Sequence, residues 1–247
     1  ETIAPPMRFT IETEMLNREQ KELRAVPKEE RLLHDVEKLL DDPHNLIGEG
    51  RTSEVREMKG NPNWCLKIID DERLEQMYGL ETPTFNTEEM EFELLGVAHR
   101  AGESVKIPRP LLAWKIKTER GRGIGVIVME RLQAITLKEI HEGARPSRKF
   151  QLNAFFESLY RYLERLHDDF HIHHRDIAEG NILIEETTGM PCLVDFGDAI
   201  KTTEGENPYT VRDDFGRVIR SYRNDLKALA EIRKRLAAVP SLTSNIR

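Results

Sequence analysis

The spacing of hydrophobic residues first indicates a helical segment near the start of the chain. Over residues 12–42 the pattern is helical, and Pro27 interrupts it. Apolar residues then recur every three or four positions, which places them along one helical face; they are Leu32, Leu33, Val36, Leu39 and Leu40. We therefore expect an N-terminal helical extension over residues 1–45, with its apolar face covered by the rest of the chain or by a regulatory partner.

After this extension the pattern changes to short β-like runs separated by Gly, Asn and Pro. Strands are expected over residues 46–47, 64–69 and 125–129. A helix is expected over residues 87–98, between the second and third of these strands. This part of the chain is therefore predicted to be mainly β-structure with one helix.

The remaining residues favour helices with a short β insert. A helix is expected over residues 148–170, because four apolar residues fall on one helical stripe: Phe155, Leu159, Leu163 and Leu166. Strands are expected over residues 181–184 and 192–194, followed by a last helix through Leu226, Leu229 and Ile232. This order predicts an α+β protein of two lobes joined near residues 130–132, with a β-rich small lobe and a helical large lobe.

Composition narrows the possible functions. Of the 247 residues 33% are charged and the net charge is −7, so the chain lacks the basic field that captures nucleic acid. No apolar run approaches the roughly 20 residues that span a bilayer, and residues 1–20 lack the pattern of a secretory signal. We expect no nucleic-acid partner and no membrane association.

The cysteines and histidines give little sign of a metal centre. Cys65 and Cys192 both lie in apolar, strand-like segments, which favours buried thiols in a reducing compartment. That compartment would be the cytoplasm, or the host cytosol for a secreted effector. Four of the eight histidines cluster without a Cys or carboxylate at metal-ligand spacing, so no metal site is expected there; they are His167, His171, His173 and His174.

Candidate chemistry begins at the sequence GEGRTSEV over residues 48–55. Its glycines would let the backbone approach phosphate oxygens, although a hairpin turn accounts for the same pattern.

Lys67 stands alone in an apolar run, and a buried lysine needs an anion or a carboxylate beside it. A lysine that faces water from an edge strand is the alternative. Glu91 on the following helix is the best partner candidate, in competition with Glu88, Glu89 and Glu93.

The sequence IHHRDIAEGNILI over residues 172–184 carries the main chemical signal. Asp176 and Asn181 lie five positions apart in a loop that leads into an apolar strand, so both side chains can reach one cleft mouth. Asp195-Phe196-Gly197 then follows the next expected strand. Together these residues supply a base, an amide oxygen and a carboxylate, which phosphoryl transfer from ATP with Mg²⁺ or Mn²⁺ requires.

These motifs, in this order, resemble those of the eukaryotic-like protein kinases from residue 46 to about residue 236. The resemblance implies a two-lobed kinase domain over residues 46–247, with a small lobe over 46–131 and a truncated large lobe over 132–247. It also implies an ATP- and Mg²⁺-dependent enzyme that phosphorylates serine or threonine hydroxyls of a protein substrate.

The resemblance further implies a role for each matching residue. Lys67 would hold the α- and β-phosphates with Glu91 as its partner, while Asp176 would be the catalytic base, preceded by Arg175. Asn181 and Asp195 would bind the metal, and Asp225 would brace the catalytic loop. The other positions would contact the nucleotide: Gly48, Gly50 and Ser53 in the loop, Val55, Cys65 and Leu183 around adenine, Met129 as gatekeeper, and Glu130 and Leu132 through their backbones.

Some positions depart from the usual family pattern. Ala178 stands where serine/threonine kinases usually have a lysine, and no Ala-Pro-Glu sequence occurs in the 30 positions from Asp195 to Asp225. The chain also ends soon after the helix that begins near Asp225. This trimming resembles minimal or atypical kinases such as the RIO kinases, the small kinase of the tRNA-modifying KEOPS complex and compact bacterial effector kinases.

Two other functions fit part of the pattern. A small-molecule kinase of the aminoglycoside or choline type shares the spacing of Asp176 and Asn181, but Arg175 and the intact Asp-Phe-Gly favour a protein kinase. A pseudokinase would bind nucleotide without catalysis. That class usually loses the lysine, the base or the metal ligand, and this chain retains all three.

The segment over residues 198–225 suggests how activity is controlled. In larger kinases the arginine before the base pairs with a phosphate on a long activation segment. A short segment loses less entropy when it becomes ordered, and Glu204 or Glu206 could supply a permanent negative charge to Arg175. We therefore expect activity without phosphorylation of this segment at Thr202 or Thr203.

Overall fold

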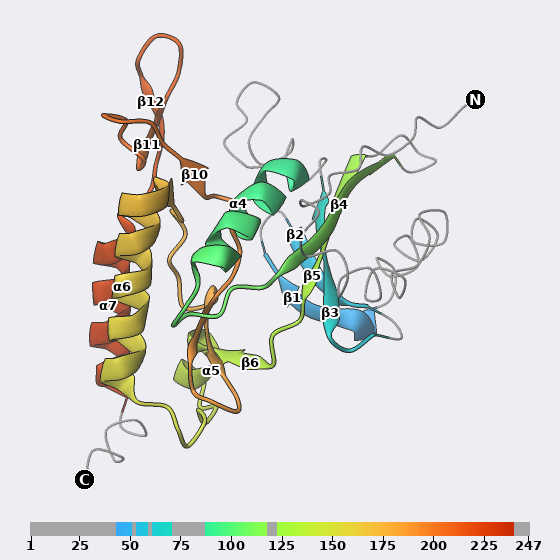
Figure 1. Cartoon of the computed structure of the whole chain (residues 1–247), viewed down its shortest axis with the longest axis vertical. Helices are drawn as coiled ribbons and strands as arrows, with labels where there is room; N and C mark the ends of the chain where they lie inside the picture. The colour runs from blue at the N-terminus through green and yellow to red at the C-terminus, as the bar shows by residue number, and fades with distance from the viewer. Residues whose placement is uncertain (1–42, 51–52, 59–60, 71–86, 118–122, 240–247) are drawn as a thin grey trace. The chain divides into compact units, whose positions relative to one another are not determined.

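The computed structural model describes residues 43–50, 53–58, 61–70, 87–117 and 123–239 (Figure 1). The helices expected over residues 12–42 lie outside these ranges. Two compact units divide the chain. The first unit contains Thr87–Phe92, Arg109–Arg131 and the described residues up to Asp70, and the second contains Glu93–Pro108 and the described residues from Leu132 onward.

A five-stranded antiparallel sheet forms most of the first unit. Its strand order is β1-β2-β3-β5-β4, so β3 and β5 are interior strands. The chain enters through a short 3₁₀ helix, η2 (Pro43–Asn45). The strands are β1 (Leu46–Glu49), β2 (Ser53–Glu57), β3 (Trp64–Asp70), β4 (Pro110–Lys117) and β5 (Gly123–Glu130), and α4 (Glu88–Ala101) contributes its first turn to this unit.

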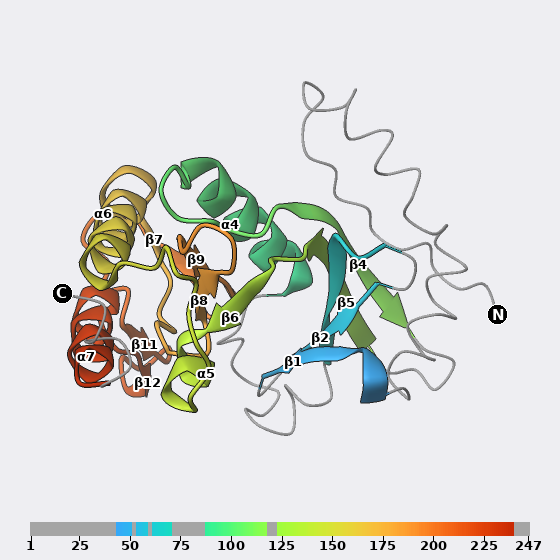
Figure 2. The ribbon, with the colours of Figure 1, turned by 90° about the horizontal axis from the view of Figure 1, so that it is seen from below.

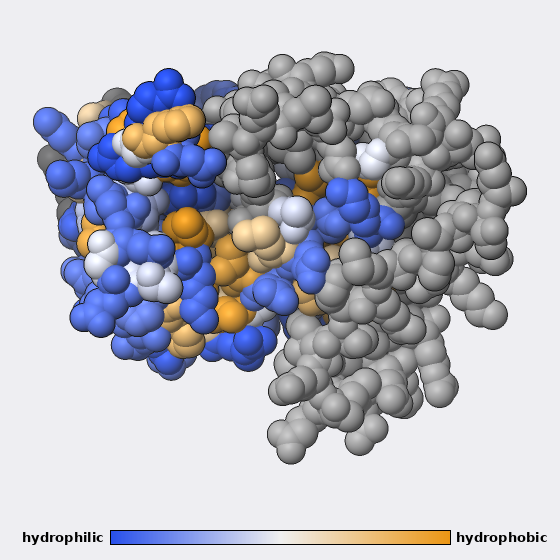
Figure 3. Space-filling model, turned by 90° about the horizontal axis from the view of Figure 1, so that it is seen from above, coloured by the Kyte–Doolittle hydropathy of each residue, from blue (hydrophilic) through white to orange (hydrophobic). Residues whose placement is uncertain are grey.

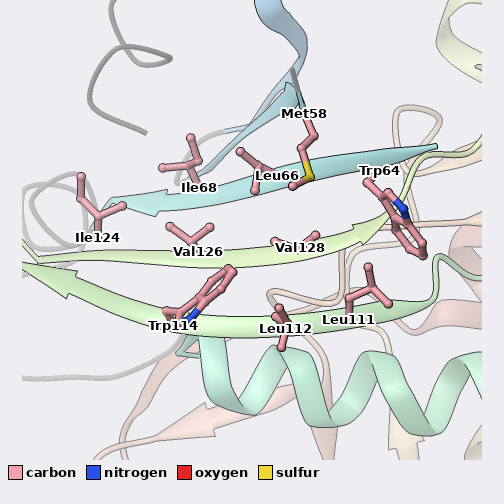
Figure 4. Packing of buried hydrophobic residues seen from close by; sticks show 10 residues of the cluster. All are labelled: Met58, Trp64, Leu66, Ile68, Leu111, Leu112, Trp114, Ile124, Val126 and Val128. Atoms are coloured by element: carbon pink, nitrogen blue, oxygen red, sulfur yellow. The ribbon is translucent and has the colours of Figure 1, made fainter. Parts of the chain in front are cut away.

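One face of this sheet holds the hydrophobic core of the first unit (Figure 4). Residues paired across neighbouring strands point to the same face, so the strand register builds continuous rows of side chains. One row joins Leu66, Val128 and Leu112, and the next joins Ile68, Val126 and Trp114. Lys67 pairs with Ile127 and therefore points to the opposite face.

The second unit combines helices with three small sheets (Figure 2). Its helices are α5 (Leu137–His141), α6 (Leu152–Phe170) and α7 (Asp225–Ala237). The sheet β6-β8-β9 is formed by Ala134–Thr136, Ile182–Glu185 and Pro191–Leu193. Two further pairs join β7 (Ile172–His173) to β10 (Ile200–Lys201), and β11 (Thr210–Arg212) to β12 (Val218–Ser221).

Helices α6 and α7 lie side by side in the second unit (Figures 1 and 2). The buried positions of α6 include Phe155, Leu159, Leu163 and Leu166, which confirms the predicted stripe. At the rim of this contact Arg233 donates a hydrogen bond to the side-chain oxygen of Asn153, with a donor–acceptor distance of 3.0 Å. Hydrophilic residues cover most of the described surface in the view of Figure 3.

The element boundaries show where the sequence pattern misleads. Helix α6 begins at Leu152, because Phe150 donates its backbone N–H to the Ser147 carbonyl and closes a turn before it. The β11–β12 hairpin was not expected. Pro110 at the start of β4 is compatible with a strand because β4 is at the edge of the sheet.

Helix α5 was also not expected, although a capping box marks its start. The hydroxyl of Thr136 accepts from the backbone N–H of Glu139, whose carboxylate accepts from the backbone N–H of Thr136. Across the described residues, none of the helices is long and apolar enough to cross a membrane.

We predict that the rows in Figure 4 carry much of the stability of the first unit. Leu66 is 1% exposed, so Leu66→Ala should lower the free energy of unfolding by about 2–5 kcal/mol through lost burial and a residual cavity. Leu46 on β1 is 39% exposed and provides a matched control, because Leu46→Ala leaves almost no cavity. Urea denaturation measures both variants, and equal losses would contradict the prediction.

Candidate active site

The first unit places one buried ion pair on the face of the sheet opposite the core. Lys67 lies on the interior strand β3, and its Nζ is 2.6 Å from Glu91 Oε1. Lys67 is 3% exposed and Glu91 2% exposed, so neither charge is solvated by bulk water. Each therefore depends on the other to offset its desolvation. The alternative of a lysine facing water from an edge strand is wrong.

Glu91 lies in the first turn of α4, and the other acidic residues of this helix have different surroundings. Glu93 is exposed. Glu88 is buried and packs against Gly125 on β5, where an added Cβ would lie 2.6 Å from Glu88 Oε2. A glycine at position 125 therefore lets the start of α4 approach the sheet closely enough for Glu91 to reach Lys67.

The glycine sequence over residues 48–55 includes the end of β1 and the start of β2. Gly50 donates its N–H to the Ser53 carbonyl at 2.8 Å, and β1 and β2 pair as an antiparallel hairpin. Val55 pairs with both Gly48 and Lys67, which places the hairpin directly beside the ion pair. A Cβ on Gly48 would meet no atom within 4 Å, so open space adjoins the backbone at this position.

The end of β5 was expected to contact adenine through its backbone. Glu130 donates its N–H to the Arg109 carbonyl at 2.9 Å, so this amide is already used within the sheet. The carbonyls of Met129 and Glu130 each lie 3.7 Å from Cys65 Sγ. Burial raises the pKa of the Cys65 thiol to about 12, so this residue stays a neutral, buried thiol as expected.

The second unit brings together the residues of the catalytic-loop motif. Asn181 Nδ2 donates to Asp176 Oδ2 at 2.8 Å and to the Asp176 carbonyl at 2.9 Å. The Asn181 carbonyl accepts from Val194 N–H at 3.0 Å, and this bond fixes the residue before Asp195 beside the loop. Asp195 adopts a left-handed φ of 65°, and its Oδ1 accepts from Gly197 N–H at 3.2 Å.

These oxygens suit a divalent cation of the magnesium type. Because the amide nitrogen of Asn181 is bound to Asp176, the amide oxygen is left for a ligand. Asp195 adds a carboxylate, and both groups are the hard oxygen donors that Mg²⁺ prefers. The donor set therefore fits the cation that the sequence suggested.

Asp225 holds the backbone of the catalytic loop. Its carboxylate is fully buried and accepts the N–H groups of His174 and Arg175, both at 2.8 Å. Arg175 has a φ of 65°, which is unfavourable for a residue with a Cβ and persists only where surrounding contacts hold it. The expectation that Asp225 braces this loop is confirmed.

The same carboxylate contacts the histidine cluster noted in the sequence, a contact that the sequence did not reveal. His167 Nε2 is 2.9 Å from Asp225 Oδ2, the rings of His167 and His173 stack at 4.4 Å, and His173 Nδ1 is 3.3 Å from the Tyr209 hydroxyl. Asp225 thus provides the carboxylate that the sequence did not place near these histidines. The potential ligand atoms of His167, His173 and Asp225 all lie within 4.8 Å of one another. Because Asp225 Oδ2 also accepts the His174 amide, the contacts are those of a hydrogen-bond network.

The remaining site residues fall in the second unit or beside the catalytic loop. Leu183 lies half-buried on β8, and Leu132 follows β5 in the second unit. The Arg175 guanidinium donates to the Asp198 carbonyl at 2.6 Å and lies over the Tyr222 ring. Sequence reasoning missed the contacts of Tyr209, Tyr222 and His167, because each contact joins segments that are far apart in the chain.

Comparison with known protein families agrees with this geometry. A family model described as the protein kinase domain matches residues 42–216. The match includes Lys67, Glu91 and the catalytic loop, and it ends within the turn that joins β11 and β12. No curated protein matches the chain.

We predict that His173 makes the second unit sensitive to acid. Burial and the nearby His167 lower the pKa of His173 from 6.5 to about 4. The unfolded chain takes up this proton near pH 6.5 and the folded chain only near pH 4, so stability is lost as the pH falls across that interval. The melting temperature of the His173→Gln variant should therefore fall less between pH 7 and pH 4.

The matched control for this measurement is His44→Gln, because His44 is exposed. The control should follow the wild-type profile. A His173→Gln profile parallel to that of the wild type over the same pH interval would show that His173 does not carry the acid sensitivity.

Proposed function

This chain belongs to the protein kinase family, and we propose that it is an active enzyme that transfers the γ-phosphoryl group of ATP to serine or threonine hydroxyls of a protein. The observation that carries this proposal is the buried pair of Lys67 Nζ and Glu91 Oε1 at 2.6 Å. A lysine so placed is held in position for phosphate oxygens, which supports catalysis over simple nucleotide binding.

The first unit is proposed to hold the nucleotide. Lys67 would contact the α- and β-phosphates, and the backbone of the glycine loop would lie over the phosphates. Since the Glu130 amide already bonds Arg109, the Glu130 carbonyl, rather than its amide, is proposed to face adenine. The further nucleotide contacts proposed in the first unit are Gly48, Gly50, Ser53, Val55, Cys65 and Met129. Those proposed in the second unit are Leu132 and Leu183.

The second unit is proposed to carry the reaction. As the acceptor oxygen attacks the γ-phosphorus, its proton passes to the carboxylate of Asp176, the new P–O bond forms, and ADP leaves. Asn181 orients that carboxylate through its bond to Asp176 Oδ2. Mg²⁺ held by Asn181 and Asp195 would neutralise charge on the phosphates.

A transfer assay with radiolabelled ATP tests this function. The wild-type protein should label a mixture of proteins on serine or threonine, and chelation of divalent metal should abolish the label. Asp176→Asn is the control, because an amide cannot accept the acceptor proton. Label only on small molecules would indicate an aminoglycoside- or choline-type kinase, and nucleotide binding without label would indicate a pseudokinase.

We predict that Lys67 and Glu91 act as one unit in turnover. Lys67→Met and Glu91→Gln should each lower kcat/KM by about 10²-fold or more, since both disturb the charge that stabilises the phosphates. Glu93→Gln is the matched control on the same helix, because Glu93 is exposed. Initial rates measure the effect, and circular dichroism checks that each variant is folded. A Lys67→Met variant with near-normal turnover would assign the phosphates to another residue.

A further inference from the structure

Four side chains beside the catalytic loop form one compact cluster. The cluster consists of Arg175, Asp198, Arg220 and Tyr222. The Cζ atoms of Arg175 and Arg220 lie 4.0 Å and 4.5 Å from the centroid of the Tyr222 ring. Arg220 Nη2 is 3.3 Å from Asp198 Oδ1, and the Tyr222 hydroxyl donates to the same oxygen at 3.3 Å.

The cluster combines two cations, one anion and one aromatic ring, and its members Arg220 and Tyr222 are half-buried. Arg175 is 8% exposed and Asp198 7% exposed. A ring face attracts a guanidinium more strongly where water is excluded. Burial raises the pKa of Tyr222 to about 12, so its hydroxyl keeps the proton that it donates to Asp198. Tyr222 therefore contacts all three charged members of the cluster.

The positions of these residues along the chain give the cluster its importance. Arg175 immediately precedes Asp176, and Asp198 follows Asp195 by three positions. The bond from Arg175 Nε to the Asp198 carbonyl at 2.6 Å thus links the catalytic loop to the turn that carries the proposed metal ligand. Any group that fixes the Arg175 side chain also fixes this link.

Tyr222 is itself anchored by backbone contacts. Its N–H donates to the Tyr209 carbonyl at 2.8 Å, and the intervening β11–β12 hairpin holds residues 210–221 together. The expected contact of Arg175 with Glu204 or Glu206 is not among the contacts of the described residues; Glu206 instead accepts the Thr203 N–H at 2.7 Å. Thr202 is buried, and its hydroxyl donates to the His171 carbonyl.

We propose that Tyr222 is a positioning residue that takes the place of a phosphate. Its ring holds Arg175 against Asp198, so that Asp176 and Asp195 keep their relative placement without phosphorylation of residues 198–225. The proposal rests on the kinase function proposed above, because it concerns the arrangement of that catalytic loop. It predicts that the ring of Tyr222, more than its hydroxyl, is required.

The kinetic test uses phosphate-free protein verified by intact mass. Wild-type protein should label substrate without a lag. Tyr222→Ala should lower kcat about tenfold with little change in the KM for ATP, as expected from the loss of cation–π contacts beside the loop. Tyr222→Phe keeps the ring and should stay within about threefold of wild type. Tyr160→Ala is the matched control, because Tyr160 is a half-buried tyrosine on α6 outside the cluster.

Hydrogen exchange of the same variants separates this proposal from the proposed function. The amides of Gly197 and Ala199, which bond Asp195 Oδ1 and the Phe196 carbonyl, should exchange faster in Tyr222→Ala but not in Tyr222→Phe or Tyr160→Ala. This readout needs no turnover, so it decides the proposal even if no acceptor is labelled. Three outcomes would overturn the proposal. They are unchanged amide exchange in Tyr222→Ala, an equal loss of kcat in Tyr222→Phe and Tyr222→Ala, and a lag in the wild-type reaction that autophosphorylation removes.

Discussion

The buried carboxylate of Asp225 is the constraint on which the second unit depends. It accepts the amides of His174 and Arg175, and the left-handed backbone of Arg175 is tolerable only while these bonds hold it. That backbone points the Arg175 side chain at the Asp198 carbonyl and leaves Asp176 within reach of Asn181. One anion at the start of α7 thus determines the geometry of a loop 50 positions earlier in the chain.

Both units stabilise a buried cation close to the proposed chemistry, but they do so differently. Lys67 has the carboxylate of Glu91 at 2.6 Å, so a directly bonded carboxylate offsets its charge. Arg175 instead has a carbonyl and an aromatic ring. The nearby carboxylate of Asp198 offsets part of its charge, whereas the second cation, Arg220, opposes it. A lysine ammonium is compact and suits the first arrangement, whereas a planar guanidinium can stack and donate at once.

The sequence predicted the parts of this protein that depend on neighbouring residues in the chain. The β runs, the stripe on α6 and the motif around Asp176 all follow from local periodicity or fixed spacing. The resemblance to kinases singled out Glu91 as the partner of Lys67, and the structure confirms this pair. The approach of α4 to the sheet at Gly125 could not be predicted from the sequence. The contacts of His167 and Tyr222 could not be predicted, since each joins segments that only the tertiary fold brings together.

The segment over residues 198–225 shows why a short connection can replace a modified one. A long loop loses much conformational entropy when it becomes ordered, and a charge-assisted contact to a phosphate can offset that loss. Here Thr202 is bonded to the His171 carbonyl, β10 pairs with β7, and the β11–β12 hairpin closes on itself. These contacts restrict the segment before α7, which is why we propose that an uncharged ring at Tyr222 can hold Arg175.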